Sequence, residues 1–468
     1  MNTDTNKTSE TEFTTLSLPA DLQQNLPSLG YTTMTSIQAA SLPSILKGSD
    51  VIAQSKTGSG KTVAFGLGLL AKLRIDQFCV QGLVLCPTRE LADQVAREIR
   101  RLARTTENVK VLTLCGGQPF RDQADSLKHG THIVVGTPGR IEDHLRKNTV
   151  DFGTVHTLVL DEADRMLEMG FQEAIDIIIG HTPPARQTLL FSATYPEQIQ
   201  TIAANITRDP LTTRSVETHT DETIEQHFYL VESDEQRLRA LRLLLLDIKP
   251  ESAAVFCSTR KETQEVADAL GEHGFSALAL HGDLDQRDRD KTLIRFTNKS
   301  TSILVATDVA ARGLDIDTID TVINYQLARD PEVHIHRIGR TGRAGSMGTA
   351  HTLSTPKEDY KLKRIQDYAG RTIVNEALPP PRLLNNPATK PSMATLQIEG
   401  GKRQKLRPGD ILGALTGKNG IPASHVGKIH ITDNRAFVAV RREATTSALR
   451  KLTDDKLKGR SFRVRKIG

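Results

Sequence analysis

The chain has 468 residues, a formal net charge of +5, only 4% aromatic residues and no tryptophan. This length predicts two to four domains, and the absence of apolar runs of about 18 residues argues against a membrane-spanning helix. Four cysteines without paired spacing predict thiols in a reducing compartment, not disulfides or a zinc site. The polar start lacks a secretory pattern, so we expect a cytoplasmic protein, and the lack of heptads favours a monomer.

Residues 1–12 are predicted to be a flexible N-terminus. From about residue 34, short apolar runs alternate with amphipathic stretches such as Arg89–Arg101, which is typical of an α/β domain with a parallel sheet covered on both faces. The expected strands are residues 51–53, 82–86, 111–114, 133–135, 158–160 and 188–191. Ligands in such sheets bind beyond the carboxyl ends of the strands, and five polar motifs fall there.

The first of these motifs is typical of a phosphate-binding loop. It runs Ser55-Lys56-Thr57-Gly58-Ser59-Gly60-Lys61-Thr62 and departs from G-x-x-x-x-G-K-[ST] by having Ser55 at the first glycine. Backbone N–H groups would hold phosphate oxygens, Lys61 would reach the β- and γ-phosphates, and the Thr62 hydroxyl would bind Mg²⁺. The sequence therefore predicts a nucleoside triphosphate and Mg²⁺ as ligands, and the family resemblance given below implies that the nucleotide is ATP.

A pair of acids follows the apolar run at residues 157–160. Asp161 suits Mg²⁺, directly or through water, and Glu162 suits the positioning or deprotonation of an attacking water. The alternative is an acidic helix N-terminus favoured by the helix dipole. Because a phosphate loop belongs to the same predicted sheet, we favour the catalytic interpretation.

The strand pattern restarts after the polar stretch 217–225, a candidate linker, and predicts a second α/β domain. Its expected strands are residues 253–257, 277–280, 302–305 and 321–323, and no internal repeat is visible. Three arginines interleave with glycines in His336–Arg343, which is unsuited to a core and typical of arginine fingers that reach a γ-phosphate. The alternative for this segment is a glycine-rich phosphate turn.

A Pro/Asn-rich stretch, Leu378–Pro391, is predicted to be an extended linker. Beyond it the pattern predicts a βαββαβ order, the ferredoxin-like topology of RRM domains. Residues 393–468 hold 17 Lys and Arg against 6 Asp and Glu, a net charge of +11, whereas residues 1–392 have a net charge of −6. This asymmetry favours an acidic polymer as partner over a merely well-solvated surface.

Taken together, residues 13 to about 355 resemble the DEAD-box RNA helicases, whose name is the tetrapeptide Asp161-Glu162-Ala163-Asp164. The resemblance implies two tandem RecA-like parallel-sheet domains at 13–212 and 213–366. A linker at 367–392 and a basic, RRM-like α+β RNA-binding domain at 393–468 would follow. Adenine contacts are implied for Tyr31, Thr33 and Gln38, a ribose contact for Asp315, and the arginine-finger role for Arg340 and Arg343.

The resemblance also implies two further sets of residues. Coupling between the ATP and RNA sites is expected of Asp164, Ser192, Thr194 and His336, with the two hydroxyls bonding the acids. Contacts of the core with RNA are expected of Pro87, Thr88, Arg89, Gly116, Gly117, Thr137, Pro138, Gly139, Arg140, Arg289 and Thr307. Because such contacts are to the RNA backbone, the core should bind any sequence.

In the terminal domain the strands lack the aromatic cluster of ordinary RRM sheets, and Phe437 and Phe462 are the only candidates. We therefore expect RNA to bind the loops and helix faces. The candidate residues are Lys402, Arg403, Lys405, Arg407, Arg441, Arg442, Arg460, Arg463, Arg465 and Lys466.

The whole chain is similar to one bacterial group of this family. That similarity implies recognition of a large-subunit ribosomal RNA hairpin, action on pre-ribosomal particles and a role in large-subunit assembly. Three other functions stay open: an ATP-gated RNA clamp with little unwinding, an assembly factor with a vestigial ATPase, and a DNA helicase.

Overall fold

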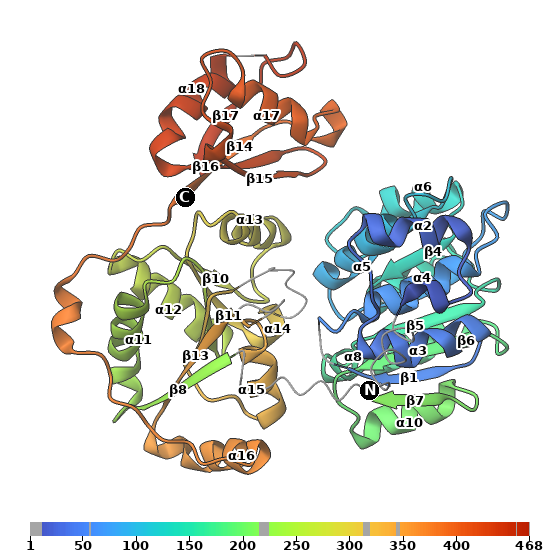
Figure 1. Cartoon of the computed structure of the whole chain (residues 1–468), viewed down its shortest axis with the longest axis horizontal. Coiled ribbons are helices and arrows are strands. Elements are labelled where there is room, and N and C mark those ends of the chain that lie inside the picture. The colour runs from blue at the N-terminus through green and yellow to red at the C-terminus, as the bar shows by residue number, and fades with distance from the viewer. Residues whose placement is uncertain are drawn as a thin grey trace, which may run out of the picture. The chain divides into compact units, whose positions relative to one another are not determined.

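The structure, a computed structural model, describes residues 12–55, 58–214, 224–311, 319–342, 347–454 and 456–467. These residues form two compact units, 12–214 and 224–467 (Figure 1). Residues 1–11 of the predicted N-terminus, and residues 217–223 of the first predicted linker, lie outside the described residues.

The first unit is built on a seven-stranded parallel sheet in the order β3-β4-β2-β5-β6-β1-β7. All six predicted strands are present, and β7 is added at one edge. Its strands are β1 (Val51–Gln54), β2 (Gly82–Leu85), β3 (Val111–Leu114), β4 (Ile133–Gly136), β5 (Thr157–Asp161), β6 (Gln187–Ser192) and β7 (Leu211–Arg214). The central strands are buried on both faces, which explains their continuous apolar sequences.

Helices cover both faces of this sheet. One apolar cluster joins it to α3, α4 and α5, and a second joins its other face to α7, α8, α9 and α10. The helices are α2 (Ala20–Ser28), α3 (Ser36–Lys47), α4 (Lys61–Ala71), α5 (Arg89–Leu102), α6 (Phe120–Lys128), α7 (Pro138–Arg146), α8 (Ala163–Glu168), α9 (Gln172–Gly180) and α10 (Glu197–Ile206). Helices α4, α5, α7 and α8 all begin just beyond a strand, so the polar motifs gather at one sheet edge.

The second unit contains a six-stranded parallel sheet in the order β10-β11-β9-β12-β13-β8. The four predicted strands are present, and β8 and β13 extend the sheet. Its strands are β8 (Ile224–Leu230), β9 (Ala253–Cys257), β10 (Ala277–Leu280), β11 (Ile303–Thr307), β12 (Thr321–Asn324) and β13 (Gly348–Ser354). Its helices are α11 (Asp234–Ile248), α12 (Arg260–Glu272), α13 (Gln286–Thr297), α14 (Asp308–Ala311), α15 (Pro331–Ile338) and α16 (Asp359–Ala369).

The terminal domain of this unit has the predicted βαββαβ order, with an antiparallel sheet β15-β16-β14-β17. Its elements are β14 (Met393–Ile398), α17 (Pro408–Thr416), β15 (Val426–Ile431), β16 (Ala436–Arg441), α18 (Thr445–Asp454) and β17 (Val464–Ile467). Leu396, Val438, Ile411 and Leu452 share one apolar core. The two helices therefore cover one face of the sheet only.

The segment predicted to be an extended linker packs against the α/β part of the second unit. It contains a short 3-10 helix, Pro381–Asn385, and Leu383 and Leu384 contact the apolar core beside α11. Upstream of it, Glu376 donates its backbone N–H to the Phe228 carbonyl at 2.7 Å. Apolar side chains within a polar-looking stretch account for this ordered path.

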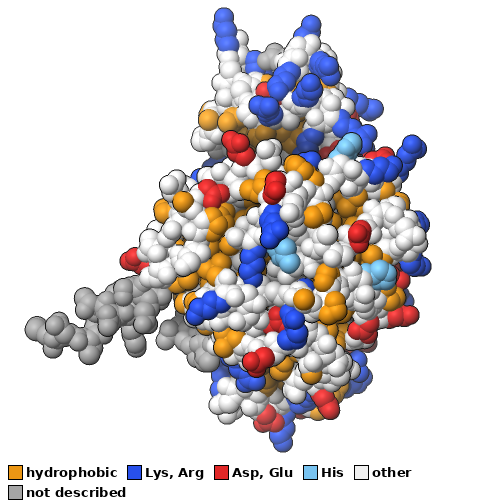
Figure 2. All heavy atoms as spheres, turned by 90° about the vertical axis from the view of Figure 1, so that its right-hand side faces the viewer, with side chains coloured by type: hydrophobic (Ala, Val, Ile, Leu, Met, Phe, Trp, Pro, Cys, Tyr) orange, Lys and Arg blue, Asp and Glu red, His pale blue; other side chains and the backbone are white. Residues whose placement is uncertain are grey.

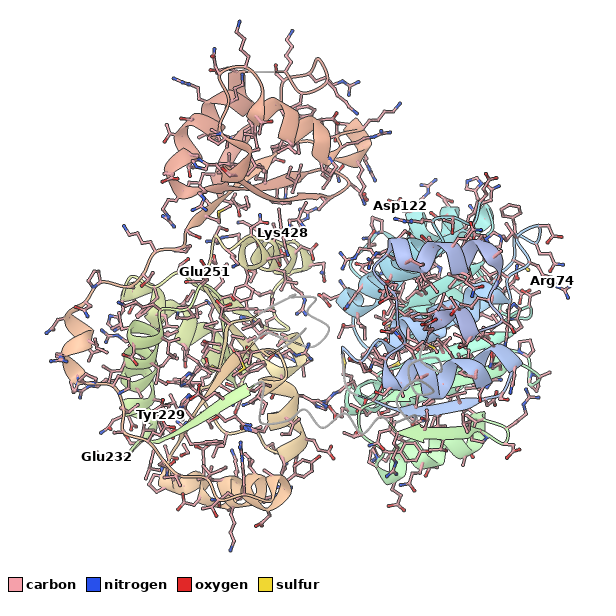
Figure 3. The ribbon with its side chains drawn as sticks, in the orientation of Figure 1. Arg74, Asp122, Tyr229, Glu232, Glu251 and Lys428 are labelled. Carbon is pink, nitrogen blue, oxygen red and sulfur yellow. The ribbon has the colours of Figure 1, made fainter. Side chains whose placement is uncertain are left out.

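The second face of the terminal sheet lies against the segment around α13. Thr395 accepts a 3.1 Å hydrogen bond from Asn298 and lies 2.7 Å from the Ser300 hydroxyl. A crevice of about 410 Å³ beside this contact has Glu251 and Lys428 in its lining (Figure 3). Thr395, Gln397 and Phe437 are buried on this face, which ordinary RRM domains leave open.

Cys86, Cys115 and Cys257 are buried free thiols, and Cys79 is partly exposed. No helix in these described ranges combines the length and apolar character that a bilayer crossing needs.

Candidate nucleotide site and RNA-contact motifs

The described part of the phosphate loop has the backbone that a phosphate cradle needs. Gly58 and Gly60 have φ of 89° and 88°, a left-handed conformation that glycine adopts without strain. The loop ends at Lys61, the first residue of α4, so Gly60, Lys61 and Thr62 open that helix. Lys56 and Thr57, also predicted to bind ATP, lie outside the described residues.

The predicted adenine-binding segment holds the phosphate loop. Gln38 donates from Nε2 to the Gly60 carbonyl at 2.9 Å and accepts from the Thr35 backbone N–H. Thr35 donates its hydroxyl to the Ser59 carbonyl at 2.7 Å. A Cβ on Gly60 would lie 2.5 Å from the Gln38 amide, so a glycine is required there. Gln38 therefore contacts the phosphate loop directly, while its contact with adenine stays a prediction.

Two other residues of this segment have defined places. Tyr31 donates its hydroxyl to Glu98 at 2.7 Å, and burial, followed by Glu98, raises the pKa of Tyr31 to about 12. Thr33 pairs with Glu12 in a single β-bridge. Tyr31 is thus held to α5 by this hydrogen bond. Its contact with adenine stays a prediction from the resemblance.

The lysine and acids predicted to be catalytic form a buried ion-pair cluster. Lys61 Nζ lies 3.1 Å from Asp161 Oδ1 and 3.9 Å from Glu162 Oε1. Burial disfavours the charged lysine, but Asp161, Glu162 and Asp164 outweigh it, so the pKa of Lys61 is raised. Burial raises the pKa of Asp161, and Lys61 opposes that rise. In this cluster the Lys61 ammonium lies among several carboxylates. Bound phosphate and Mg²⁺ would change these ion pairs.

Asp161 passes a structural test for Mg²⁺. Its side chain has an exposed fraction of 0%, and, apart from the Lys61 pair, neither oxygen receives a well-formed hydrogen bond from any described residue. A fully buried carboxylate with open lone pairs suits a hard divalent cation, and Thr62, which carries a hydroxyl, directly follows the Lys61 that pairs with Asp161. When bound, Mg²⁺ would neutralise phosphate charge at this site.

Glu162 has a strained backbone. It lies between the end of β5 and the start of α8 with φ of 55° and ψ of 53°, a left-handed conformation in a non-glycine residue. Such a conformation costs about 1 kcal/mol and is common at functional positions. It lets the chain turn from strand to helix at the sheet edge, at a residue predicted to be catalytic, and the sequence pattern alone did not show this conformation.

The last acid of the tetrapeptide is bonded to the segment after β6. Asp164 Oδ2 accepts from both the backbone N–H and the hydroxyl of Thr194, each at 3.0 Å. The predicted bond from Thr194 to an acid is therefore present. Ser192 behaves differently: its hydroxyl accepts from the Asp164 backbone N–H and donates to the Thr194 carbonyl. Hydrogen bonds thus link the acidic tetrapeptide to the segment at the end of β6.

The predicted RNA motifs of the first unit lie at the same sheet edge. Thr88 caps α5 by accepting from the Leu91 backbone N–H, and the Arg89 guanidinium lies against Gly116. A Cβ on Gly116 would approach Arg89 Nη2 to 2.6 Å, so a glycine is needed for this contact. Gly117 has φ of 76°. Arg140 donates to the Gln118 carbonyl and to the Gln123 side chain.

The residues that precede Arg140 in its motif form the start of α7. Thr137 precedes α7, Pro138 and Gly139 are its first two residues, and Thr137 donates its backbone N–H to the Leu114 carbonyl. Pro87 connects β2 to the cap of α5. Helix starts present N–H groups, which suit phosphate oxygens.

In the second unit, two predicted RNA residues lie on neighbouring elements. Thr307 ends β11 and accepts from the Ala310 backbone N–H, and Arg289 of α13 donates to the Ala310 carbonyl at 2.9 Å. His336 lies in the last turn of α15, and Arg340 follows that helix. Arg343 and Asp315 lie outside the described residues.

One expectation about the arginine-rich motif is wrong. Arg337, the first of its three arginines, is 2% exposed and belongs to the core. It pairs with Asp308 at 2.6 and 2.9 Å and donates to the Gln326 carbonyl. A bidentate carboxylate satisfies a buried guanidinium, so this arginine joins the motif to the segment after β11.

Arg260 is a functional candidate that the sequence interpretation missed. It follows the cap residue Thr259 at the start of α12, as Arg89 follows Thr88 at the start of α5. It lies beside Gly282 and pairs with Asp283 at 2.7 Å. The repeated pattern Cys-x-Thr-Arg, at residues 86–89 and 257–260, was the available signal, and it shows that a local repeat does exist.

In the terminal domain all ten predicted basic residues are exposed, and Figure 2 shows many Lys and Arg side chains on its surface. Lys402, Arg403 and Lys405 share one tight turn before α17. Two others have protein contacts as well: Arg442 donates to the Pro391 carbonyl, and Arg465 lies 3.8 Å from Glu399. The basic turn is therefore an exposed part of the predicted RNA surface.

Comparison with known proteins agrees with this geometry. Residues 35–202 match the DEAD/DEAH box helicase family, residues 236–345 the helicase conserved C-terminal domain, and residues 395–466 the DbpA RNA binding domain. The chain is 54% identical to the ATP-dependent RNA helicase DbpA of Escherichia coli, over 97% of this chain and 99% of that protein. The chain belongs to the DEAD-box RNA helicases, of the DbpA type.

Other relatives support the same family. The helicase is 34% identical to DbpA of Bacillus subtilis, over 97% of this chain and 99% of that protein. Among solved structures, Saccharomyces cerevisiae Dbp5 L327V bound to RNA and ADP BeF3 matches with a TM-score of 0.71 and 29% identity. That match covers 78% of this helicase and 95% of the Dbp5 chain. This helicase is accordingly an ATP-hydrolysing enzyme with an RNA-binding domain.

Proposed function

We propose that this helicase separates short RNA duplexes and is directed by its terminal domain to a large-subunit ribosomal RNA hairpin, acting on pre-ribosomal particles during large-subunit assembly in the cytoplasm. The observation that carries the proposal is the buried cluster of Lys61, Asp161 and Glu162 in a chain that also contains a basic domain of the DbpA type. A vestigial ATPase would not be expected to keep Lys61, Asp161 and Glu162 buried in one cluster.

In the proposed mechanism the residues of the first unit bind the nucleotide and prepare water. Lys61 and the loop N–H groups would hold the phosphates, and Asp161 with Thr62 would hold Mg²⁺, which would supply positive charge to the phosphates. Glu162 orients the attacking water and accepts its proton. Arg340 and Arg343 of the second unit supply positive charge to the γ-phosphate.

The link between Asp164 and Thr194 supports ATP-dependent RNA binding. A change in the charge of the acidic cluster on nucleotide binding would reach the segment after β6 through two 3.0 Å hydrogen bonds. Core contacts with the RNA backbone carry no sequence information, so we assign the choice of RNA to the terminal domain.

Glu162→Gln in the full chain tests the catalytic assignment. We expect RNA-stimulated ATP turnover to fall by at least about 100-fold, because the water loses its base, while hairpin affinity stays within about twofold. Phosphate release and hairpin binding measured by fluorescence anisotropy check both. Loss of hairpin affinity together with turnover would contradict the proposed division of labour.

The ATP-gated clamp is the second candidate, because the same residues would close on RNA without unwinding it. Strand separation of a short duplex placed beside the hairpin, with ATP, decides between them. Release of the strand supports a helicase action on this substrate, and ATP-dependent retention without release favours the clamp. A DNA version of the same substrate tests the DNA-helicase alternative.

A further inference from the structure

A buried glutamine joins two of the RNA motifs in the first unit. Gln123 lies on α6, next to Asp122 (labelled in Figure 3), and its side chain is 6% exposed. Its Nε2 donates to the Cys115 carbonyl at 2.8 Å, and its Oε1 lies 2.9 Å from Arg140 Nη1 and 3.1 Å from His144 Nε2. Cys115 directly precedes Gly116 and Gly117, so one amide bridges the glycine turn and the α7 motif.

The donors and acceptors around this amide define its orientation. Arg140 can only donate, so the atom facing it must be Oε1, and Nε2 must then face the Cys115 carbonyl. Burial, followed by the charge of Arg140, lowers the pKa of His144 to about 4, so the ring is neutral at pH 7. A neutral His144 that donates from Nε2 leaves Nδ1 as an acceptor, and the Thr149 hydroxyl, 2.7 Å from Nδ1 and 3.1 Å from the His144 carbonyl, can donate to either. Gln123 thus occupies one defined position.

The same contacts restrict the Arg140 guanidinium. Nη1 uses its two hydrogens on the Gln118 carbonyl, at 3.0 Å, and on Gln123, at 2.9 Å. Nε lies 3.9 Å from the Asp143 carboxylate, so a phosphate contact would use Nη2, in a plane fixed by these two bonds. Phe120 supports this placement, because the guanidinium carbon lies 5.9 Å from its ring centre.

We propose that Gln123 is a positioning residue for RNA: it holds the Arg140 guanidinium and the turn at Gly116 in one fixed geometry, and it acts on RNA through Arg140. This inference rests on the RNA role proposed above for Arg140. Neither the family resemblance nor the motif pattern assigned Gln123 a role.

The test uses Gln123→Met in the full chain, which keeps the side-chain volume and removes every polar contact. The readout is the concentration of unstructured single-stranded RNA that gives half-maximal ATPase stimulation. We expect this concentration to rise about fivefold to tenfold, the effect of losing one ordinary hydrogen bond. The ATPase rate at saturating RNA should change by less than about twofold, because the nucleotide cluster is untouched.

Gln81→Met is the matched control. Gln81 is another buried glutamine of this unit, and it also makes three hydrogen bonds, to Arg74 and Gln77, away from the RNA motifs. It should lower the melting temperature without changing the RNA concentration for half-maximal stimulation. An equal weakening of RNA stimulation in both variants would reduce the effect of Gln123 to general stability and overturn the proposal.

A double-mutant cycle with Arg140→Ala separates the possible failures. If Arg140→Ala alone leaves RNA stimulation unchanged, the RNA role of Arg140 fails. If Arg140→Ala weakens it and Gln123→Met does not, the positioning role fails. The proposal predicts that the double variant is no weaker than Arg140→Ala alone; multiplied losses would overturn it. Should Gln123→Met not fold, Gln123→Asn, which withdraws the same amide, replaces it in the cycle.

Discussion

At the scale of single residues, the cluster of Lys61, Asp161 and Glu162 shows which features of the predicted ATP site the sequence could predict and which it could not. Lys61, Asp161 and Glu162 could be named from the sequence, because phosphate loops and paired acids have recognisable spacing. The use of the Gln38 amide by Gly60 could not be named, because it joins segments that are apart in the chain. The left-handed backbone of Glu162 could not be named either, because glutamate carries no sequence signal for that conformation. The core position of Arg337 was missed for the same reason: its partner Asp308 is 29 residues away.

Histidine burial gives a prediction at this scale. His334 stacks on Phe228, and burial, followed by the charges of Arg337 and Arg371, lowers the pKa of His334 to about 3. The unfolded chain binds a proton near pH 6.5 and the folded one does not, so stability falls as pH drops from about 6.5 toward 3.

We therefore expect His334→Tyr to lose less melting temperature than the parent between pH 7 and pH 5, since it removes up to one proton from this linkage. Circular dichroism melts at the two pH values measure the difference. Identical losses in the two proteins would show that His334 does not control this acid sensitivity.

At the scale of elements, short buried strands ending in polar motifs were predictable, because parallel strands covered on both faces are continuously apolar. The strands β7 and β8 were not, since β7 (Leu-Thr-Thr-Arg) is a mostly exposed edge strand and β8 begins inside a segment that looked like a linker. The ordered path of the linker was missed because the packing of Leu383 and Leu384 on the core beside α11 is a long-range contact that the local sequence does not show.

The contact between Arg89 and Gly116 predicts the effect of a single methyl group. Gly116→Ala places a Cβ against the guanidinium, which must move, so the RNA concentration for half-maximal ATPase stimulation should rise several-fold. Gly180→Ala, at a helix position with open space around its Cβ, is the control and should behave as the parent. If Gly116→Ala needs the same RNA concentration as the parent, Arg89 does not contribute to RNA binding.

The covered face of the terminal sheet gives the second element-scale prediction. Phe437 is 5% exposed and lies in a crevice whose lining includes Asp288 and Lys291 of α13. Phe437→Leu keeps this packing apolar, so hairpin affinity measured by fluorescence anisotropy should stay within about twofold. A loss above about tenfold would show that RNA uses the sheet face after all, since base stacking contributes about 1–3 kcal/mol per base.

At the scale of the whole molecule, the sequence was sufficient for the order of the domains and for the family, because many motifs occur together in one order. It was also sufficient to find the charge asymmetry, with a net +11 in residues 393–468 against −6 before them. The central claim is that the nucleotide cluster supplies energy to any RNA backbone, while the basic terminal domain selects the RNA.

The most direct test of that claim is steady-state ATPase activity with no RNA, with unstructured single-stranded RNA, and with a large-subunit ribosomal RNA hairpin fragment. It compares the full chain with a full-chain variant carrying Arg403→Ala and Lys405→Ala in the exposed basic turn. We predict that the parent responds to the fragment at far lower concentrations than to unstructured RNA, and that the variant loses most of this preference while keeping its response to unstructured RNA. Equal responses of the parent to both RNAs would contradict the account.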